Sequence, residues 1–220
     1  MIITIDGPAG AGKSTVAREL AQRLGFRFLD TGAMYRAVAW AAIQRRVDLH
    51  DEHAITNLID DLTIETGEGW IRVNGVDVTD QIRSTDVTAA IRHVADNRAV
   101  RTYLSEQQRL VAGKGNIVTE GRDQGTFVFP DADIKVFLTA TPQERARRRQ
   151  QELERNGDQL ALNDVLEQQN KRDEQDASRP FGGLAKADDA LEIVSDEMTI
   201  DDVLDRIEAA VRGRSGSHGF

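Results

Sequence analysis

The stretch TIDGPAGAGKST, residues 4–15, restricts the possible folds of this chain more than any other segment. An apolar run, MIITID, precedes a glycine-rich loop, and the periodicity predicts an amphipathic helix from Lys13 to Leu24 after it. Residues 7–14 match the pattern G-x-x-x-x-G-K-[ST]. A strand, a glycine-rich turn and a helix in this order predict a loop whose backbone N–H groups surround phosphate oxygens.

Each part of this loop has an expected role in holding a nucleoside triphosphate. Glycines let successive amides turn inward, Lys13 should reach the β- and γ-phosphates, and Ser14 should ligate Mg²⁺. A chance glycine-rich turn is a poor alternative because the full pattern occurs between a strand and a helix. The expected ATP-binding residues are Gly7, Pro8, Ala9, Gly10, Ala11, Gly12, Lys13, Ser14 and Thr15.

The remainder of the chain alternates expected strands and helices. Strands are predicted at 26–30, 116–120, 133–140 and 190–196, and helices at 33–46, 51–61, 84–95, 97–112, 142–155, 161–176 and 199–212. Most of the strands are almost continuously apolar, which is typical of a parallel sheet covered by helices on both faces. The fold class expected is therefore α/β.

One segment, residues 62–80, departs from this alternation. Its sequence LTIETGEGWIRVNGVDVTD has a period of two, with turn signals at 67–69 and at Asn74-Gly75. The pattern predicts a small antiparallel β insert. We expect one domain over residues 1–212, containing this insert, and a disordered tail over 213–220.

Composition limits the function classes. The net charge of −9 makes nonspecific nucleic-acid binding a poor default, and the absence of cysteine excludes disulfides and thiolate metal sites. No apolar run is long enough to span a bilayer, and no basic stretch precedes MIITID, so we expect a cytoplasmic protein without a signal peptide. The cations are 23 Arg and 5 Lys, and the planar arginine fork pairs well with phosphate.

Polar residues follow two of the expected strands. Thr31, Tyr35 and Arg36 come after strand 26–30, and Arg122 and Asp123 come after strand 116–120. Parallel α/β sheets bind ligands at the carboxyl ends of their strands. Solvated loop charge is the alternative, and the appearance of arginines at two strand ends makes it less attractive.

Arg172, Asp176 and Arg179 are spaced i, i+4 and i+7, which places them on one face of the predicted helix. The positive groups of this face suit an anionic acceptor. An ordinary i, i+4 ion pair between Arg172 and Asp176 explains the first two residues equally well, and this alternative stays open.

A second cluster places Arg145, Arg147, Arg148 and Arg149 within five residues. A solvated helix with a Glu144–Arg148 ion pair is one interpretation. Four neighbouring arginines also repel one another, and this favours an anionic partner such as a triphosphate under a closing lid.

The segment Asn170-Lys171-Arg172-Asp173 matches the N-K-x-D pattern of GTPases. No strand precedes it, its flanks are polar and helical, and no glycine of the chain completes a D-x-x-G pattern. A GTPase switch is therefore disfavoured, and the match is interpreted as coincidence.

Taken in order, IDGPAGAGKST, LDTGAMYRAVA, EGRDQGTFVFPDADIKVFLTA, ERARRR and KRDEQDASR resemble the bacterial cytidylate kinases, which are nucleoside-monophosphate kinases. The resemblance runs from about Ile2 to Arg212, and its most specific parts are DTGAMYR, GRDQGT-VFPDA and R-D-x-x-D-x-x-R. It implies a P-loop kinase fold, with the β insert in the monophosphate-binding region and a lid and following helix at about 142–180.

The resemblance also implies roles for individual residues. Arg36, Arg122 and Arg179 would hold the acceptor phosphate, Arg172 and Asp176 the ribose, and Arg101 and Asp123 the cytosine. Arg145, Arg148 and Arg149 would contact the ATP phosphates from the lid. The implied catalytic residues are Lys13, Arg122, Arg145, Arg148 and Arg149. The implied acceptor-binding residues are Thr31, Tyr35, Arg36, Arg101, Arg122, Asp123, Arg172, Asp176 and Arg179.

The activity implied is ATP- and Mg²⁺-dependent phosphorylation of CMP and dCMP to CDP and dCDP by a monomer, in pyrimidine nucleotide metabolism, without nucleic-acid or membrane partners. Arg92 stands where the family commonly has a serine nine residues before the base-reading arginine, and 182–184 read Gly-Gly-Leu in place of Ala-Pro-Leu. Two alternatives remain: a P-loop kinase for another small acceptor, such as uridylate or a non-nucleotide alcohol, and a nucleotide sensor that has lost catalysis.

Overall fold

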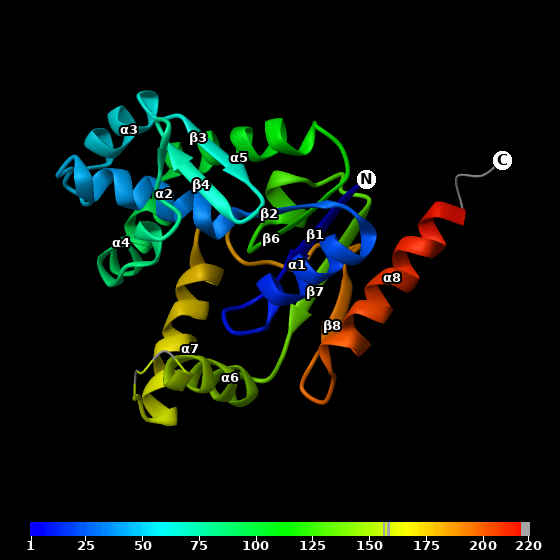
Figure 1. Ribbon diagram of the computed structural model, residues 1–220. Coiled ribbons are helices and arrows are strands. Elements are labelled where there is room, and N and C mark those ends of the chain that lie inside the picture. The colour runs from blue at the N-terminus through cyan, green and yellow to red at the C-terminus, as the bar shows by residue number, and fades with distance from the viewer. Residues whose placement is uncertain (156, 158, 217–220) are drawn as a thin grey trace. The chain divides into compact units, whose positions relative to one another are not determined.

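The computed structural model describes residues 1–155, 157 and 159–216 (Figure 1). The chain divides into two compact units. Unit 1 contains Met1–Phe26 and the chain from Asn116 onward, and unit 2 contains Arg27–Gly115. The prediction of one domain over residues 1–212 is not tested by this division and stays a prediction.

Unit 1 is built on parallel strands that follow one another in the order β6-β1-β7-β8. Its strands are β1 (Ile2–Asp6), β6 (Ile117–Gly121), β7 (Ile134–Thr139) and β8 (Leu191–Val194). Its helices are α1 (Lys13–Leu24), α6 (Pro142–Arg155), α7 (Leu162–Ser178) and α8 (Ile200–Gly216), with a π-helical turn η2 (Gln124–Val128). The α/β class expected from the apolar strands is confirmed.

The register of the strands determines where polar residues emerge. Asp6 of β1 pairs with Gly121 of β6 and with Phe137 of β7. Because all these strands are parallel, their carboxyl ends meet at one edge of the sheet. Ile3, Ile5 and Leu138 are fully buried along the strands, and α1 packs against α8. The apolar strands therefore form a rigid support for the loops at that edge.

Unit 2 combines helices with the predicted β insert. Its elements are β2 (Arg27–Asp30), α2 (Thr31–Gln44), α3 (Glu52–Asp60), β3 (Ile64–Gly67), β4 (Trp70–Val73), β5 (Val76–Asp77), the 3₁₀ turn η1 (Gln81–Arg83), α4 (Thr85–Asp96) and α5 (Arg98–Ala112). Strands β3, β4 and β5 form an antiparallel sheet in that order, so the insert predicted at 62–80 is confirmed. Asn74 and Gly75 have φ of 50° and 79°, as a two-residue hairpin turn with both residues left-handed requires.

Local signals explain where several helices begin and end. Asp30 accepts a hydrogen bond from the Ala33 amide at 2.9 Å, so α2 starts at Thr31, two residues earlier than predicted. Gly25, at φ 65°, ends α1. Helix α8 continues to Gly216, beyond the end predicted at Arg212. Of the predicted tail, residues 217–220 lie outside the described residues.

The turns η1 and η2 were not among the predicted elements. In η2 the Asp123 carbonyl accepts from the Val128 amide at 3.1 Å, and the Gln124 carbonyl accepts from Phe129 at 2.7 Å. These i→i+5 bonds have no periodic apolar signature over a segment so short.

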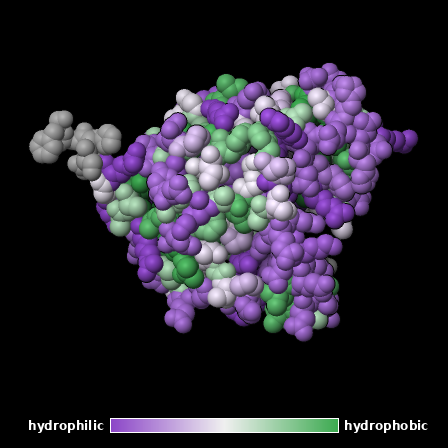
Figure 2. Space-filling model, turned by 180° about the vertical axis from the view of Figure 1, so that it is seen from behind, coloured by the Kyte–Doolittle hydropathy of each residue, from purple (hydrophilic) through white to green (hydrophobic). Residues whose placement is uncertain are grey.

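Within the described residues, no helix has the length and apolar character needed to cross a membrane. On the face shown in Figure 2, hydrophilic residues predominate and the hydrophobic ones form separate small patches.

Candidate active site

The glycine-rich loop, residues 7–12, connects the end of β1 to the start of α1. Gly7, Gly10 and Gly12 have φ of 151°, 76° and 86°, a region that residues with a Cβ rarely adopt. A Cβ on Gly7 would lie 1.9 Å from the backbone oxygen of Leu138. Sterics therefore require glycine at this position, and the loop lies directly against the end of β7.

Lys13, the first residue of α1, directly follows this loop and is only 5% exposed. Its Nζ donates a hydrogen bond to the Pro8 carbonyl oxygen at 2.8 Å. Burial lowers the pKa of Lys13 to about 7, and the nearby positive charge of Arg122 acts in the same direction. An anionic phosphate beside this side chain would favour its charged form.

Oxygen groups lie at the ends of β1 and β6, next to the loop. The Ser14 hydroxyl donates to Glu120 Oε1 at 2.9 Å. The Asp6 carboxyl accepts from the amides of Gln124 and Gly125 at 2.9 and 2.7 Å. Burial raises the pKa of Asp6 to about 6, although these two hydrogen bonds act to lower it. Hydroxyl and carboxylate oxygens are the ligands that Mg²⁺ prefers, so this donor set fits the ion. In the described part of the chain no three His, Cys, Asp or Glu side chains form a ready cluster for a metal.

Arg145 is the most buried of the predicted lid arginines. Its Nε donates to the Ala140 carbonyl at 3.0 Å, and its Nη1 donates to the Ala9 carbonyl at 2.9 Å and to Asp173 Oδ2 at 2.5 Å. The side chain thus connects α6 to the glycine-rich loop and to α7.

The side chains of the other three clustered arginines, Arg147, Arg148 and Arg149, are more exposed than that of Arg145. Arg148 bonds Glu144 at 2.8 Å and the Ser195 carbonyl at 2.7 Å, so the predicted i, i+4 ion pair of the solvated-helix interpretation is present. Arg149 pairs with Glu152 at 2.7 Å, and Arg147 pairs with Glu144. Contact of Arg145, Arg148 and Arg149 with ATP phosphates stays a prediction.

A second charged group forms between η2 and the end of α7. The two carboxylate oxygens of Asp176 bond Arg122 Nε and Arg179 Nη1, each at 2.8 Å. Burial raises the pKa of Asp176, but the charges of Arg122 and Arg179 outweigh burial and lower it overall, with a contribution from Arg172. The arginine predicted after strand 116–120 and the arginine at the end of α7 therefore share one buried carboxylate.

Asp123 is buried at the start of η2, where its backbone carbonyl accepts from the amides of Phe127 and Val128. Its charge also contributes to the raised pKa of Asp6. Asp123 is therefore placed beside the β1 edge, as expected of a residue that follows strand β6.

The remaining predicted acceptor residues lie in unit 2. Tyr35 and Arg36 lie in the first turns of α2, inside the helix predicted from Ala33, and the Asp30 cap adds Thr31 to the same helix. Arg36 Nη1 donates to Thr88 Oγ1 at 2.8 Å. The buried Arg101 donates to the Ala95 carbonyl at 3.0 Å, and its guanidinium lies 5.6 Å from the ring centre of Tyr35. Unit 2 thus groups Arg101 with Tyr35 and anchors Arg36 to α4.

Arg92, which replaces the serine common in the family, is exposed on α4. Its Nε donates to His93 Nε2 at 3.3 Å. This contact occupies the side chain within its own helix.

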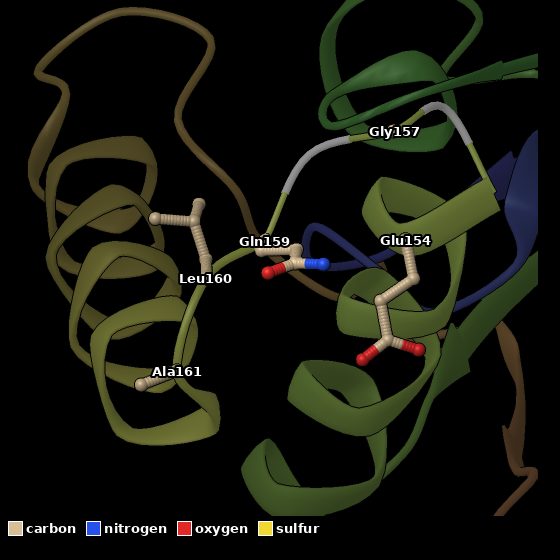
Figure 3. Close-up of a pocket in the computed structure, with 5 residues that line it drawn as sticks. All are labelled: Glu154, Gly157, Gln159, Leu160 and Ala161. Carbon is tan, nitrogen blue, oxygen red and sulfur yellow. The ribbon is translucent and has the colours of Figure 1, made fainter.

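A cavity of about 500 Å³ lies at the connection between α6 and α7, and the glycine-rich loop is not among its lining residues. It is lined by Glu154, Gly157, Gln159, Leu160 and Ala161, and Figure 3 shows Gln159 and Leu160 on the connecting segment beside α7. These five described residues include no cation, which makes the cavity a poor place for a phosphate.

Three carboxylates of the site were missed in the sequence: Asp6, Glu120 and Asp173. Asp6 and Glu120 could have been found, because each stands at the end of a strand that the sequence predicted. Asp173 carries no such signal. Its Oδ1 accepts from the Ala9 amide, 164 residues away, at 3.2 Å.

Comparisons with known proteins agree with this arrangement. The family model described as cytidylate kinase matches residues 3–213. A cytidylate kinase of Rhodopirellula baltica is 47% identical over 212 residues, covering 96% of this chain and 93% of that protein. A bifunctional pantoate ligase/cytidylate kinase of Synechococcus sp. strain CC9311 is 48% identical over 98% of this chain, which spans 45% of that longer protein.

Solved structures support the fold. The chain resembles an uncharacterized protein of Eubacterium ventriosum with a TM-score of 0.51 at 15% identity, covering 96% of this chain and 98% of that one. It resembles a shikimate kinase of Bacteroides thetaiotaomicron with a TM-score of 0.50 at 16% identity and the same coverage. The parallel sheet and the glycine-rich loop are those of a P-loop kinase. The chain belongs to the cytidylate kinase family.

Proposed function

We propose that this protein transfers the γ-phosphoryl group of ATP in line to the 5′-phosphate of CMP or dCMP, and so forms CDP or dCDP. The main support for the proposal is that two phosphate-binding groups lie close together in unit 1. Lys13 begins α1, directly after the loop that follows β1, and Arg122 follows β6, the strand paired with β1. Phosphate-binding groups on adjacent strand ends suit a reaction in which both reactants are phosphates.

The donor is assigned to residues 7–15. Amides of the loop and the N-terminus of α1 favour negative charge, and Lys13 adds a cation with little exposure. Ser14, hydrogen-bonded to Glu120, would hold Mg²⁺, which neutralises charge on the β- and γ-phosphates when bound.

The nucleophile is an oxygen of the acceptor phosphate, which is already anionic. A strong general base is therefore unnecessary, and the work of the protein is positioning and charge neutralisation. Arg122 and Arg179 are assigned to the acceptor phosphate, and Asp176 orients both of them through its two oxygens. Such pairing keeps two guanidinium groups in fixed directions before an anion arrives.

Other acceptor contacts are assigned from the family resemblance. Arg36 contacts the acceptor phosphate, and Arg172 and Asp176 contact the ribose. Arg101 and Asp123 bind the cytosine. Thr31 and Tyr35, which precede Arg36 in the sequence, are also assigned to the acceptor site. Arg101 is held by Ala95 and by the ring of Tyr35, which supports a fixed base-reading position.

Three arginines of α6 are assigned to the ATP phosphates: Arg145, Arg148 and Arg149. Arg148 and Arg149 are held by Glu144 and Glu152, partners that a phosphate can replace. Closure over the phosphates would also exclude water, which competes with the acceptor for the γ-phosphoryl group. We further propose that the protein acts as a cytoplasmic monomer in pyrimidine nucleotide metabolism, without nucleic acid or membrane partners.

The first test offers Mg-ATP with CMP, dCMP, UMP, AMP and GMP in separate reactions and measures ADP formation. The proposal predicts strong preference for CMP or dCMP. Preference for UMP would keep the P-loop mechanism and reassign the acceptor. Absence of turnover with every acceptor, with ATP affinity retained, would favour the sensor alternative.

A further inference from the structure

The N-K-x-D segment, interpreted as a coincidental match, lies within α7, and its aspartate makes contacts with the glycine-rich loop. Asp173 lies within α7, where one carboxylate oxygen accepts from the Ala9 amide at 3.2 Å and the other accepts from Arg145 at 2.5 Å. Arg145 in turn donates to the Ala9 carbonyl at 2.9 Å. The ion pair therefore holds both backbone groups of a single residue of the glycine-rich loop.

These bonds determine the orientation of two consecutive peptide planes. The Pro8–Ala9 peptide gives its N–H to Asp173, and its carbonyl accepts from Lys13 Nζ at 2.8 Å. In a planar trans peptide the N–H and the carbonyl point in opposite directions, so Asp173 directs the Pro8 carbonyl toward Lys13. By the same rule, the bond from Arg145 to the Ala9 carbonyl directs the Gly10 N–H away from Arg145.

Helix α7 also supports the next residue of the loop. Gln169, one turn before Asp173, is buried, and its Nε2 donates to the Arg145 carbonyl at 3.3 Å. A Cβ on Gly10 would lie 2.5 Å from this Nε2. One face of α7, which carries Gln169 and Asp173, thus packs against the glycine-rich loop at Ala9 and Gly10.

The pair itself is little exposed, with 6% of the Arg145 side chain and 18% of the Asp173 side chain accessible. Removing Asp173 would leave the Arg145 guanidinium without its carboxylate and would release the Ala9 amide. A buried cation without a counter-charge is costly, so the loop would have to move or take up solvent.

We propose that Asp173 is a positioning residue for the donor site: with Arg145 it presets the peptide planes that aim Lys13 and the Gly10 amide at the phosphates. This inference rests on the proposed role of the loop in binding ATP. It assigns Asp173 to the donor, whereas Asp176, three residues later, serves the arginines of the acceptor.

The test measures the Kd of Mg-ATP by calorimetry without any acceptor. Asp173→Ala removes both the hydrogen bond from the Ala9 amide and the ion pair with Arg145, and it should weaken binding about tenfold. Asp173→Asn keeps an oxygen for the Ala9 amide but loses the charge, and it should weaken binding about threefold. Glu174→Gln, at an exposed position of the same helix, is the matched control and should bind as the wild type does.

Steady-state kinetics separate positioning from general damage. In both Asp173 variants the KM for ATP should rise and the kcat should fall, because Lys13 is no longer held in place, while the KM for CMP stays within about threefold of the wild type. Equal increases in both KM values, or an unchanged Kd with only a lower melting temperature, would overturn the inference. Should the alanine variant fail to fold, the near-isosteric asparagine variant decides: a wild-type Kd there would also overturn it. Failure of the wild type to bind Mg-ATP would instead contradict the proposed function.

Discussion

Lys13, which follows the glycine-rich loop, and the accessible arginines of α6, Arg148 and Arg149, both offer positive charge to an anion, but they hold that charge differently. Lys13 is buried at 5% exposure and bonds the Pro8 carbonyl of the loop. The Arg149 side chain is 41% exposed and pairs with a nearby glutamate of the same helix. Lys13 is already held beside the loop before a ligand binds. Arg149 must give up its glutamate partner before it can contact a phosphate. Preorganised groups contribute most to catalysis because no reorganisation is needed during the reaction.

The largest effect is expected from Lys13→Ala. Loss of the cation that neutralises the transferred phosphoryl group should lower kcat/KM by about a thousandfold, with the melting temperature nearly unchanged. Lys114→Ala, at an exposed position, is the control for loss of a lysine. A rate within tenfold of the wild type would remove Lys13 from the proposed mechanism.

A smaller, acceptor-specific effect is expected from Asp176→Asn. The two guanidinium groups that share this carboxylate would lose their common orientation, so the KM for CMP should rise about tenfold. The Kd of Mg-ATP, measured alone, should stay within about twofold. If the KM for CMP and the Kd of Mg-ATP rise together, Asp176 does not act on the acceptor site alone.

The same carboxylate predicts a pH dependence of stability. Burial raises the pKa of Asp176, but Arg122 and Arg179 outweigh burial and lower it below its usual 3.8. Its charged form therefore stabilises the fold fully above that value, and this stabilisation is lost as the pH falls through the lowered pKa. Denaturant unfolding should show the wild type more stable than Asp176→Asn by about 2 kcal/mol from pH 7 to pH 5. The difference should shrink below pH 3.8, and a difference that grew in acid would contradict the assignment.

The smallest effect is expected from Arg149, whose exposed ion pair a phosphate can replace. Arg149→Ala should lower kcat about fivefold and change the unfolding free energy by less than about 0.5 kcal/mol, because an exposed pair adds little stability. Arg147→Ala removes another exposed, paired arginine of α6 that has no proposed substrate contact, and it should change kcat less than twofold. Equal losses in the two variants would indicate a general charge effect of α6.

The contrast between the two sites also shows what a sequence can predict. The loop, the parallel strands and the hairpin at Asn74-Gly75 depend on local patterns, and each was predicted. The start of α2 was predicted two residues late because Asp30 caps it. Contacts between distant positions have no local pattern: Ala9 meets Asp173 across 164 residues, and Arg148 meets Ser195 at the end of β8. Spacing placed Asp176 on a helix face, but it could not show that Arg122 and Arg179 share its carboxylate.

The central claim is that the γ-phosphoryl group of ATP goes to the acceptor nucleotide and not to water. The most direct measurement follows ATP, ADP, CMP and CDP together by ³¹P NMR in a reaction started with Mg-ATP and CMP. We expect ADP and CDP to appear in equal amounts and ATP to be stable when CMP is omitted. ADP that accumulates without CDP, or at the same rate without CMP, would contradict it.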